Sequence, residues 1–187
     1  MRKVLKTMTS HHHHGDRGIM KKVTGVKRIA ELIAPSDEGL KLCGERLRDG
    51  KLVAFPTETV YGLGANALNR DAVLSIFKTK GRPLTDPVIV HVSKPNDAHK
   101  FVSFEKQSGK DAFSRLATTF WPGPLTIVAR ARECLPSEVS AGTGFVGVRC
   151  PAHPIARRLS EAARDPVAAP SANRFGHVSP TSSSHVL

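Results

Sequence analysis

Residues 52–64 read LVAFPTETVYGLG, and this stretch decides the fold class expected for the chain. A continuous apolar run such as LVAF, too short for a helix, is typical of a strand buried on both faces. Pro56 ends the run because it has no N–H for a strand ladder, and Thr57–Thr59 follow with polar side chains. Gly62 and Gly64 permit close backbone approaches that a side chain would block. A strand that delivers such a loop indicates a small polar ligand, and a purely structural turn is the alternative.

Outward from this stretch, helical and strand patterns alternate along the chain. Apolar residues at helical spacing predict four helices, over residues 36–50, 70–82, 111–123 and 153–163. Short apolar runs predict further strands, over residues 88–92, 125–131, 145–150 and 166–169. In the third helix, Phe113, Leu116 and Phe120 are expected to face inward. The alternation predicts an α/β fold in one domain, with no internal repeat.

The first 34 residues differ in composition from the rest. They hold eight Lys or Arg against Asp16 and Glu31, few aromatics and a run of four histidines, His11–His14. We therefore expect residues 1–34 to be a basic, disordered extension and residues 35–187 to be the folded domain. The histidine run is read as a tag remnant or a native low-complexity tract, with a metal site the weakest reading. The shortage of acidic residues also leaves a mitochondrial targeting role open.

The rest of the composition excludes several classes of protein. The formal net charge is +12, which suits an anionic ligand or a nucleic acid, although a solvated basic face explains it equally well. Cys43, Cys134 and Cys150 show no CxxC spacing, which argues for a reducing compartment, here the cytoplasm, and against a disulfide framework or a zinc site. The chain lacks an apolar run of about 18 residues, so no membrane span is expected.

The segment KTKGRP, residues 78–83, gathers cations where the second helix ends. Lys78, Lys80 and Arg82 can converge on one anion there, since lysine supplies a compact charge and arginine a two-pronged fork for phosphate. The alternative is that these cations only complement the helix dipole. Neither GxxxxGK[ST] nor a GxGxxG after a strand is present, so the two common nucleotide-binding signatures are absent.

Two further strands end in polar groups. Arg149 closes FVGVRC and is either a surface charge or a fork for a carboxylate, and His91 lies within the apolar run VIVHV, where a lone histidine is more often a core residue. The loop APSANRFGHVSPT, residues 169–181, offers hydroxyl and amide groups from Ser171, Asn173 and Ser179. Polar clusters that follow the strands of an α/β sheet are common ligand sites.

These clusters together resemble one family, the YrdC-like threonylcarbamoyl-AMP synthases. The matching strings are FPTETVYGLG, IFKTKGRPLTDPVIVHV, FWPGPLTIV, GVRCPAHPIA and PVAAPSANRFGHVSPT, in the family's order and at similar spacings over residues 39–186. The resemblance implies a twisted mixed α/β sheet with flanking helices around a positively lined cavity. It also implies condensation of L-threonine, bicarbonate or carbon dioxide, and ATP with Mg²⁺ into threonylcarbamoyl-AMP and pyrophosphate. A separate transferase then modifies tRNA to threonylcarbamoyladenosine.

The resemblance also implies roles for individual residues. Lys80 and Arg82 are expected to neutralise charge in catalysis. The expected ATP contacts are Lys78, Lys80, Arg82, Asp86, Phe145, Ser171, Asn173 and Ser179. The expected threonine contacts are Thr59, His91, Arg149 and Ala169. Asp86 stands where the family commonly has a neutral amide, which weakens its assignment.

One departure from the family keeps three other functions open. Family members continue past the SPT…HV motif with a further strand and loop, so we expect the C-terminal part of the domain to be missing. An inactive fragment of the synthase is therefore one alternative. The others are a module of the same fold that binds double-stranded RNA or tRNA, and a carbamoyl-transfer domain like that of hydrogenase-maturation enzymes. The RNA reading predicts salt-dependent affinity without threonine, and no RNA-binding signature supports it.

Overall fold

The computed structural model describes residues 5–8 and 30–186. Within the segment expected to be disordered, the described residues form two strands, β1 (Leu5–Met8) and β2 (Ala30–Ile33). β1 pairs antiparallel with β2 on one side and with β3 (Leu52–Phe55) on the other. The sheet therefore includes backbone from before residue 35. The sequence does not predict these two strands, because each has only four residues and no clear alternating pattern. The run His11–His14 lies outside the described residues.

Nine strands of the described chain form one mixed sheet in the order β2-β1-β3-β4-β9-β5-β8-β7-β6. The strands after β3 are β4 (Gly62–Asn66), β5 (Val90–His91), β6 (Val102–Ser103), β7 (Ile127–Ala131), β8 (Phe145–Arg149) and β9 (Val167–Ala168). Among these described strands, β5 and β8 are the one parallel pair, with Val90 opposite Val148 and His91 opposite Arg149. The carboxyl ends of β5 and β8 therefore meet at the same place in the sheet.

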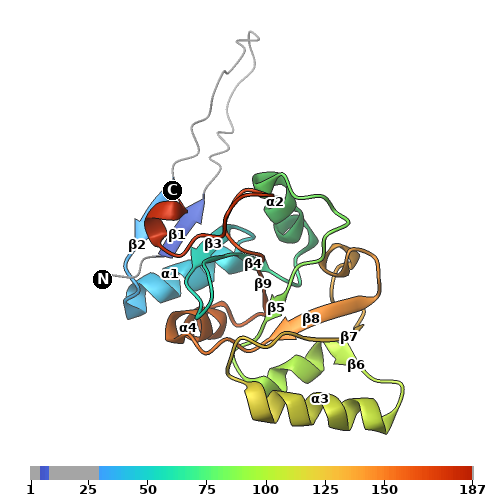
Figure 1. Cartoon of the computed structure of the whole chain (residues 1–187). Coiled ribbons are helices and arrows are strands. Elements are labelled where there is room, and N and C mark those ends of the chain that lie inside the picture. The colour runs from blue at the N-terminus through green and yellow to red at the C-terminus, as the bar shows by residue number, and fades with distance from the viewer. Residues whose placement is uncertain (1–4, 9–29, 187) are drawn as a thin grey trace.

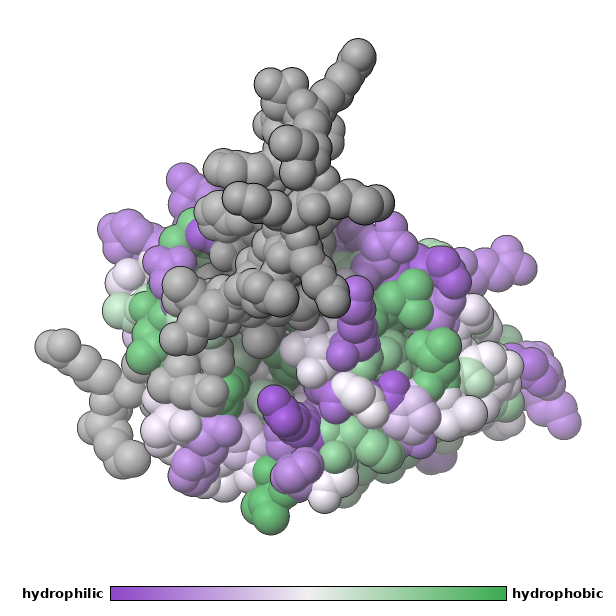
Figure 2. Space-filling view, turned by 90° about the horizontal axis from the view of Figure 1, so that it is seen from above, coloured by the Kyte–Doolittle hydropathy of each residue, from purple (hydrophilic) through white to green (hydrophobic). Residues whose placement is uncertain are grey.

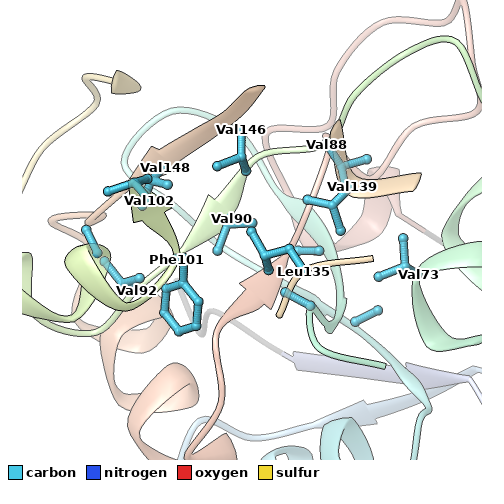
Figure 3. Packing of buried hydrophobic residues seen from close by; sticks show 14 of the residues in the cluster. Val73, Val88, Val90, Val92, Phe101, Val102, Leu135, Val139, Val146 and Val148 are labelled. Carbon is cyan, nitrogen blue, oxygen red and sulfur yellow. The ribbon is translucent and has the colours of Figure 1, made fainter. Parts of the chain in front are cut away.

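The alternation of side chains along β3 divides the core into two clusters. Leu52 and Ala54 pack into a large cluster with α2, whereas Val53 and Phe55 pack into a second cluster on the opposite face of the sheet. This is why the run LVAF is apolar throughout, as the sequence predicts for a strand covered on both sides. Figure 3 shows how the valines of β5 and β8, among them Val90 and Val148, point into the large cluster.

Four helices cover the sheet (Figure 1). They are α1 (Asp37–Arg48), α2 (Arg70–Lys80), α3 (Gln107–Phe120) and α4 (Pro154–Ala163). The described chain also contains the short 3₁₀ helices η1 (Pro95–Lys100), η2 (Ser137–Ser140) and η3 (Ser183–His185). The Ser36 side chain caps α1 by accepting from the Gly39 N–H, 3.1 Å away. α1 and α4 lie side by side and supply the second cluster. The sequence therefore locates all four helices.

Two details of the helices and strands differ from expectation. Leu116 and Phe120 of α3 are exposed, and of the three residues predicted to face inward only Phe113 is buried. Residues 62–66 form strand β4, although the sequence indicates a loop after Pro56 and glycines disfavour strands. Gly64 fits this strand because a Cβ there would lie 2.8 Å from the Phe55 ring and 2.7 Å from the Val167 side chain. Gly64 thus serves packing within the sheet rather than a tight turn.

The surface is mixed in character. Figure 2 shows hydrophilic and hydrophobic residues interspersed on the face seen from above in Figure 1. The exposed large apolar side chains come from several elements, among them Leu84, Val128, Phe175 and Val178. Across residues 5–8 and 30–186, the helices include none that is long and apolar enough to span a membrane.

Candidate functional site

His91 and Arg149 lie opposite each other where the parallel strands β5 and β8 end. Their neighbours Val90 and Val148 point into the large core cluster, so His91 and Arg149 point to the other face of the sheet. Both side chains are buried, with 4% and 7% of their surface exposed. The two buried polar residues thus meet at one point of the sheet.

Two other parts of the chain, Gly123 and the loop that holds Glu58 and Thr59, contact the guanidinium group of Arg149. Its Nε donates to the carbonyl oxygen of Gly123, and one Nη1 N–H donates to Thr59 Oγ1, both over 3.2 Å. Its Nη2 lies 2.8 Å from Glu58 Oε1 and forms an ion pair with it. This short contact is one of the interactions that lower the pKa of Glu58. The fork is therefore held in place while part of its donor capacity stays unused.

The loop from Thr57 to Val60 brings Glu58 and Thr59 to the guanidinium. Thr57 Oγ1 folds the loop by accepting from the N–H groups of Thr59 and Val60, each 3.2 Å away, and by donating to the Val60 carbonyl. This is the local turn that threonine hydroxyls favour. The PTET loop therefore carries its own turn and presents its next two side chains to Arg149.

Glu58 also joins this loop to the start of α4. Its Oε1 accepts from the Ala152 N–H at 3.0 Å, and its Oε2 accepts from the His153 N–H at 3.3 Å. Burial would raise the pKa of Glu58, but the contacts with Arg149 and the Ala152 N–H outweigh it and lower that pKa below its ordinary value. Glu58 is thus an anion bound to three groups from two other segments.

His91 is a neutral partner in this layer. Burial, together with the nearby charge of Arg149, lowers the pKa of His91 to about 4. Its ring packs edge-on against Phe55, with 6.0 Å between ring centroids, and its Nδ1 has no hydrogen-bond partner in the described chain. A buried ring nitrogen without a partner is unusual in a purely structural histidine.

Lys80 belongs to a second polar group, at the C-terminal end of α2. Its Nζ donates to the carbonyl oxygen of Ser171 over 2.6 Å and to that of Asn173. Burial lowers the pKa of Lys80 to about 8, and the charge of Arg82 adds to the effect. Lys78, two residues earlier, is exposed, because residues at i and i+2 lie on different sides of a helix. Lys80 is thus buried and feels the charge of Arg82, whereas Lys78 lies on the exposed side of α2.

Arg82 is held by the loop that follows α2. Its Nε donates to the Asp86 carbonyl oxygen at 3.2 Å, and one Nη2 N–H donates to the Pro87 carbonyl oxygen at 2.9 Å. The Asp86 carboxylate lies 3.7 Å from the same Nη2, and the Phe175 ring lies 5.8 Å from the guanidinium carbon. Asp86 is thus a partner of Arg82 rather than an isolated side chain.

Backbone pairing connects the two polar groups. Gly62, at the start of β4, forms an isolated bridge with Ser171, and the Tyr61 carbonyl accepts from the Ala172 N–H at 2.8 Å. The Tyr61 N–H in turn donates to the Pro180 carbonyl, which brings the neighbouring Ser179 beside the same strand end. A continuous path therefore runs from Lys80 through the 171–173 loop and the start of β4 to the PTET loop at Arg149.

The remaining predicted residues lie at varying distances from this path. Asn173 offers its carbonyl to Lys80, and its side-chain Oδ1 is buried without a partner. Ala169 is buried, and its N–H donates to the Ile89 carbonyl. Phe145 begins β8, four residues or roughly 13 Å of strand from Arg149, and packs against Arg130 instead. The structure therefore does not bring Phe145 together with Arg149.

Sequence reasoning missed two partners of Arg149. The sequence marks Glu58 only as a polar member of the loop, and it gives no sign of the Gly123 carbonyl as a partner of Arg149. Glu58 stands between two threonines in the stretch PTET. This position indicates a polar loop, but it does not indicate that Glu58 pairs with Arg149. No cluster of three or more His, Cys, Asp or Glu suited to a metal ion occurs within residues 5–8 and 30–186. A cavity of about 570 Å³ lies elsewhere, lined by η1 and the end of α4, and includes none of the predicted site residues.

Comparison with known proteins shows the family. The Sua5/YciO/YrdC family model, described as "Telomere recombination", matches residues 45–187. A threonylcarbamoyl-AMP synthase of Pyrococcus abyssi is 48% identical over 147 residues, covering 79% of this chain and 42% of the relative. The Bacillus subtilis enzyme of the same name is 40% identical over 159 residues, covering 84% of this chain and 45% of the relative.

The fold agrees with a solved structure from the same group. P. abyssi Sua5 complexed with L-threonine matches with a TM-score of 0.76 and 45% identity, covering 81% of this chain and 43% of that one. The chain thus spans less than half the length of these relatives. The resemblance drawn from the five sequence strings is confirmed: the protein belongs to the Sua5/YciO/YrdC family.

Proposed function

We propose that this domain catalyses formation of threonylcarbamoyl-AMP from L-threonine, bicarbonate or carbon dioxide, and ATP. The threonine amine attacks the one-carbon substrate to give N-carboxythreonine, with loss of water when bicarbonate is used. An oxygen of this carbamate then attacks the α-phosphorus of ATP, and pyrophosphate leaves. The route needs positioning and charge neutralisation, with no covalent intermediate on the protein.

One observation carries the proposal: Arg149, which can bind a carboxylate, and Lys80, which can bind a phosphate, are connected through the 171–173 loop, the start of β4 and the PTET loop. Arg149 is fixed by Gly123 and Thr59, and Lys80 is fixed on the 171–173 loop that bridges to Gly62. The threonine carboxylate and the ATP triphosphate both carry negative charge, and the reaction requires the two substrates to be bound side by side. The relatives' names and the threonine complex of P. abyssi Sua5 support the same assignment.

The residues divide into two sets by the charge that they handle. Arg149 binds the threonine carboxylate, with Thr59 beside it and neutral His91 beneath. Lys80 and Arg82 neutralise the phosphates as pyrophosphate departs, and Mg²⁺ enters with the triphosphate. Ser171, Asn173 and Ser179 supply neutral hydrogen-bonding groups from the neighbouring loop. A separate transferase consumes the product and modifies tRNA, in the cytoplasm.

The test is to mix the purified chain with ATP, Mg²⁺, threonine and bicarbonate, and to measure threonylcarbamoyl-AMP by mass. We expect product only when all three substrates are present. The control omits each substrate in turn. If no product forms, a melting scan with threonine and with ATP separates two cases. Stabilisation by both ligands would mean that turnover needs the rest of the relatives' length, and stabilisation by neither would refute the proposal.

A further inference from the structure

We propose that Glu58 is a positioning residue for the threonine carboxylate: it holds Arg149 by charge while leaving the guanidinium N–H groups for the substrate. The inference rests on the proposed function, and it concerns a residue that contacts Arg149 rather than the reacting atoms. Glu58 Oε1 lies 2.8 Å from Arg149 Nη2.

The donors of Arg149 show what remains for a ligand. Arginine has five N–H groups. The Nε–H is used by the Gly123 carbonyl and one Nη1 N–H by Thr59 Oγ1, and Nη2 lies 2.8 Å from Glu58 Oε1. A carboxylate accepts from two arginine N–H groups at once. The N–H groups that remain on Nη1 and Nη2 are therefore the donors left for a ligand carboxylate, on a side chain that is otherwise fixed.

Glu58 fixes this fork rather than occupying it as a stand-in for substrate. A carboxylate that merely filled the fork would be bound by Arg149 alone. Both oxygens of Glu58 instead accept backbone N–H groups, from Ala152 and His153 at the start of α4. Glu58 is thus anchored on a second element, and it transmits that anchoring to Arg149. It also supplies the counter-charge that a buried guanidinium needs in the absence of substrate.

The experiment compares Glu58→Gln with a matched control, Glu138→Gln. Glu138 also pairs with an arginine, Arg70, at 2.6 Å, but on η2 and outside the site. Threonine affinity is measured by titration calorimetry, KM by product formation, and folding by thermal melting. We expect Glu58→Gln to weaken threonine binding about tenfold with KM for ATP changed less than about twofold, because one charged contact to the fork is lost. Glu138→Gln should leave both values unchanged.

Two further variants separate positioning from general loss of structure. Glu58→Asp keeps the negative charge beside Arg149. The Glu58 side chain is 22% exposed, and Glu58→Asp should keep more threonine affinity than Glu58→Gln because the charge is retained. In an Arg149→Ala background, Glu58→Gln should have no further effect on threonine affinity, because the fork that it positions is gone. A folding defect alone would instead weaken threonine and ATP binding together.

The outcomes distinguish this inference from the proposed function. Unchanged threonine affinity in Glu58→Gln, with the wild type binding threonine, would overturn the inference and leave the proposed function intact. Tighter threonine binding would also overturn it, since Glu58 would then be a competitor for the fork. A wild type that binds no threonine would overturn both.

Discussion

Lys80 Nζ donates a 2.6 Å hydrogen bond to the carbonyl oxygen of Ser171, a residue 91 positions later in the chain. The same ammonium donates to the Asn173 carbonyl, so one cation holds the whole 171–173 loop. Under the proposed function this ammonium also binds phosphate. An ammonium has three N–H donors, which leaves one for a ligand. The cation that neutralises the triphosphate is therefore also the group that fixes the loop beside it.

Lys80→Ala should lower ATP-dependent turnover by about 100-fold or more, because it removes a buried charge at the phosphates and frees the 171–173 loop. Lys78→Ala should change KM for ATP by no more than about fivefold, since exposed charges interact weakly through water. Product formation measured at varied ATP checks both variants. Equal losses in the two variants would contradict the placement of Lys80.

The pKa of Lys80, lowered to about 8, predicts a pH dependence of ATP binding. The ammonium loses its charge as pH rises through this value, so ATP affinity in the wild type should fall between pH 8 and 10. Lys80→Arg keeps its charge throughout this range and should show a flat profile, whatever its absolute affinity. Titration of ATP at a series of pH values compares the two slopes. Parallel profiles would show that another group controls the pH dependence.

Arg149→Lys should raise KM for threonine roughly 10- to 100-fold and leave KM for ATP nearly unchanged. Lysine keeps the charge, but it cannot reproduce the contacts to Gly123 and Thr59 together with a two-pronged carboxylate contact. Initial rates at varied threonine and at varied ATP separate the two constants. Equal effects on both substrates would count against the carboxylate role.

Two glycine substitutions in helices should change stability in opposite directions. A Cβ on Gly44 of α1 would lie 2.5 Å from the backbone of Ala162 in α4, so Gly44→Ala should cost about 1–3 kcal/mol. A Cβ on Gly109 of α3 meets nothing closer than 3.9 Å, so Gly109→Ala should stabilise by up to about 1 kcal/mol. Urea unfolding of both variants measures the difference. Destabilisation by both would mean that α3 packs more closely than its contacts indicate.

Much of the fold could be predicted because local patterns decide it. The helical spacing in α2 and the uniformly apolar run of β3 are each predicted correctly from neighbouring residues. The sequence of β4, GLGAN, does not predict a strand. It suits a strand only beside Phe55 and Val167, and these residues come from other segments. Helical spacing puts Phe120 on the inward face of α3, but it does not tell how much of that face the sheet covers. Phe120 is therefore exposed although its position predicts burial.

The site was predicted in its residue types more than in its contacts. Lys80, Arg149 and His91 stand out as polar groups at the ends of apolar elements, and all three are buried. What the sequence does not contain is the pairing of Arg149 with Glu58, or of Lys80 with the Ser171 carbonyl, because each pairing depends on how the sheet brings distant strands together. The exposure of Lys78 follows from helix geometry, and it could have been predicted.

Thr59 and Arg149 lie 90 positions apart in the chain, and this separation has a consequence for biosynthesis. A nascent chain displays the PTET loop long before its arginine has been translated, and the backbone of Ala152 and His153 that anchors Glu58 emerges later still. The loop and its turn can form early, but the substrate fork cannot. Threonine therefore has no fork to bind on the growing chain until β8 and the start of α4 have left the ribosome.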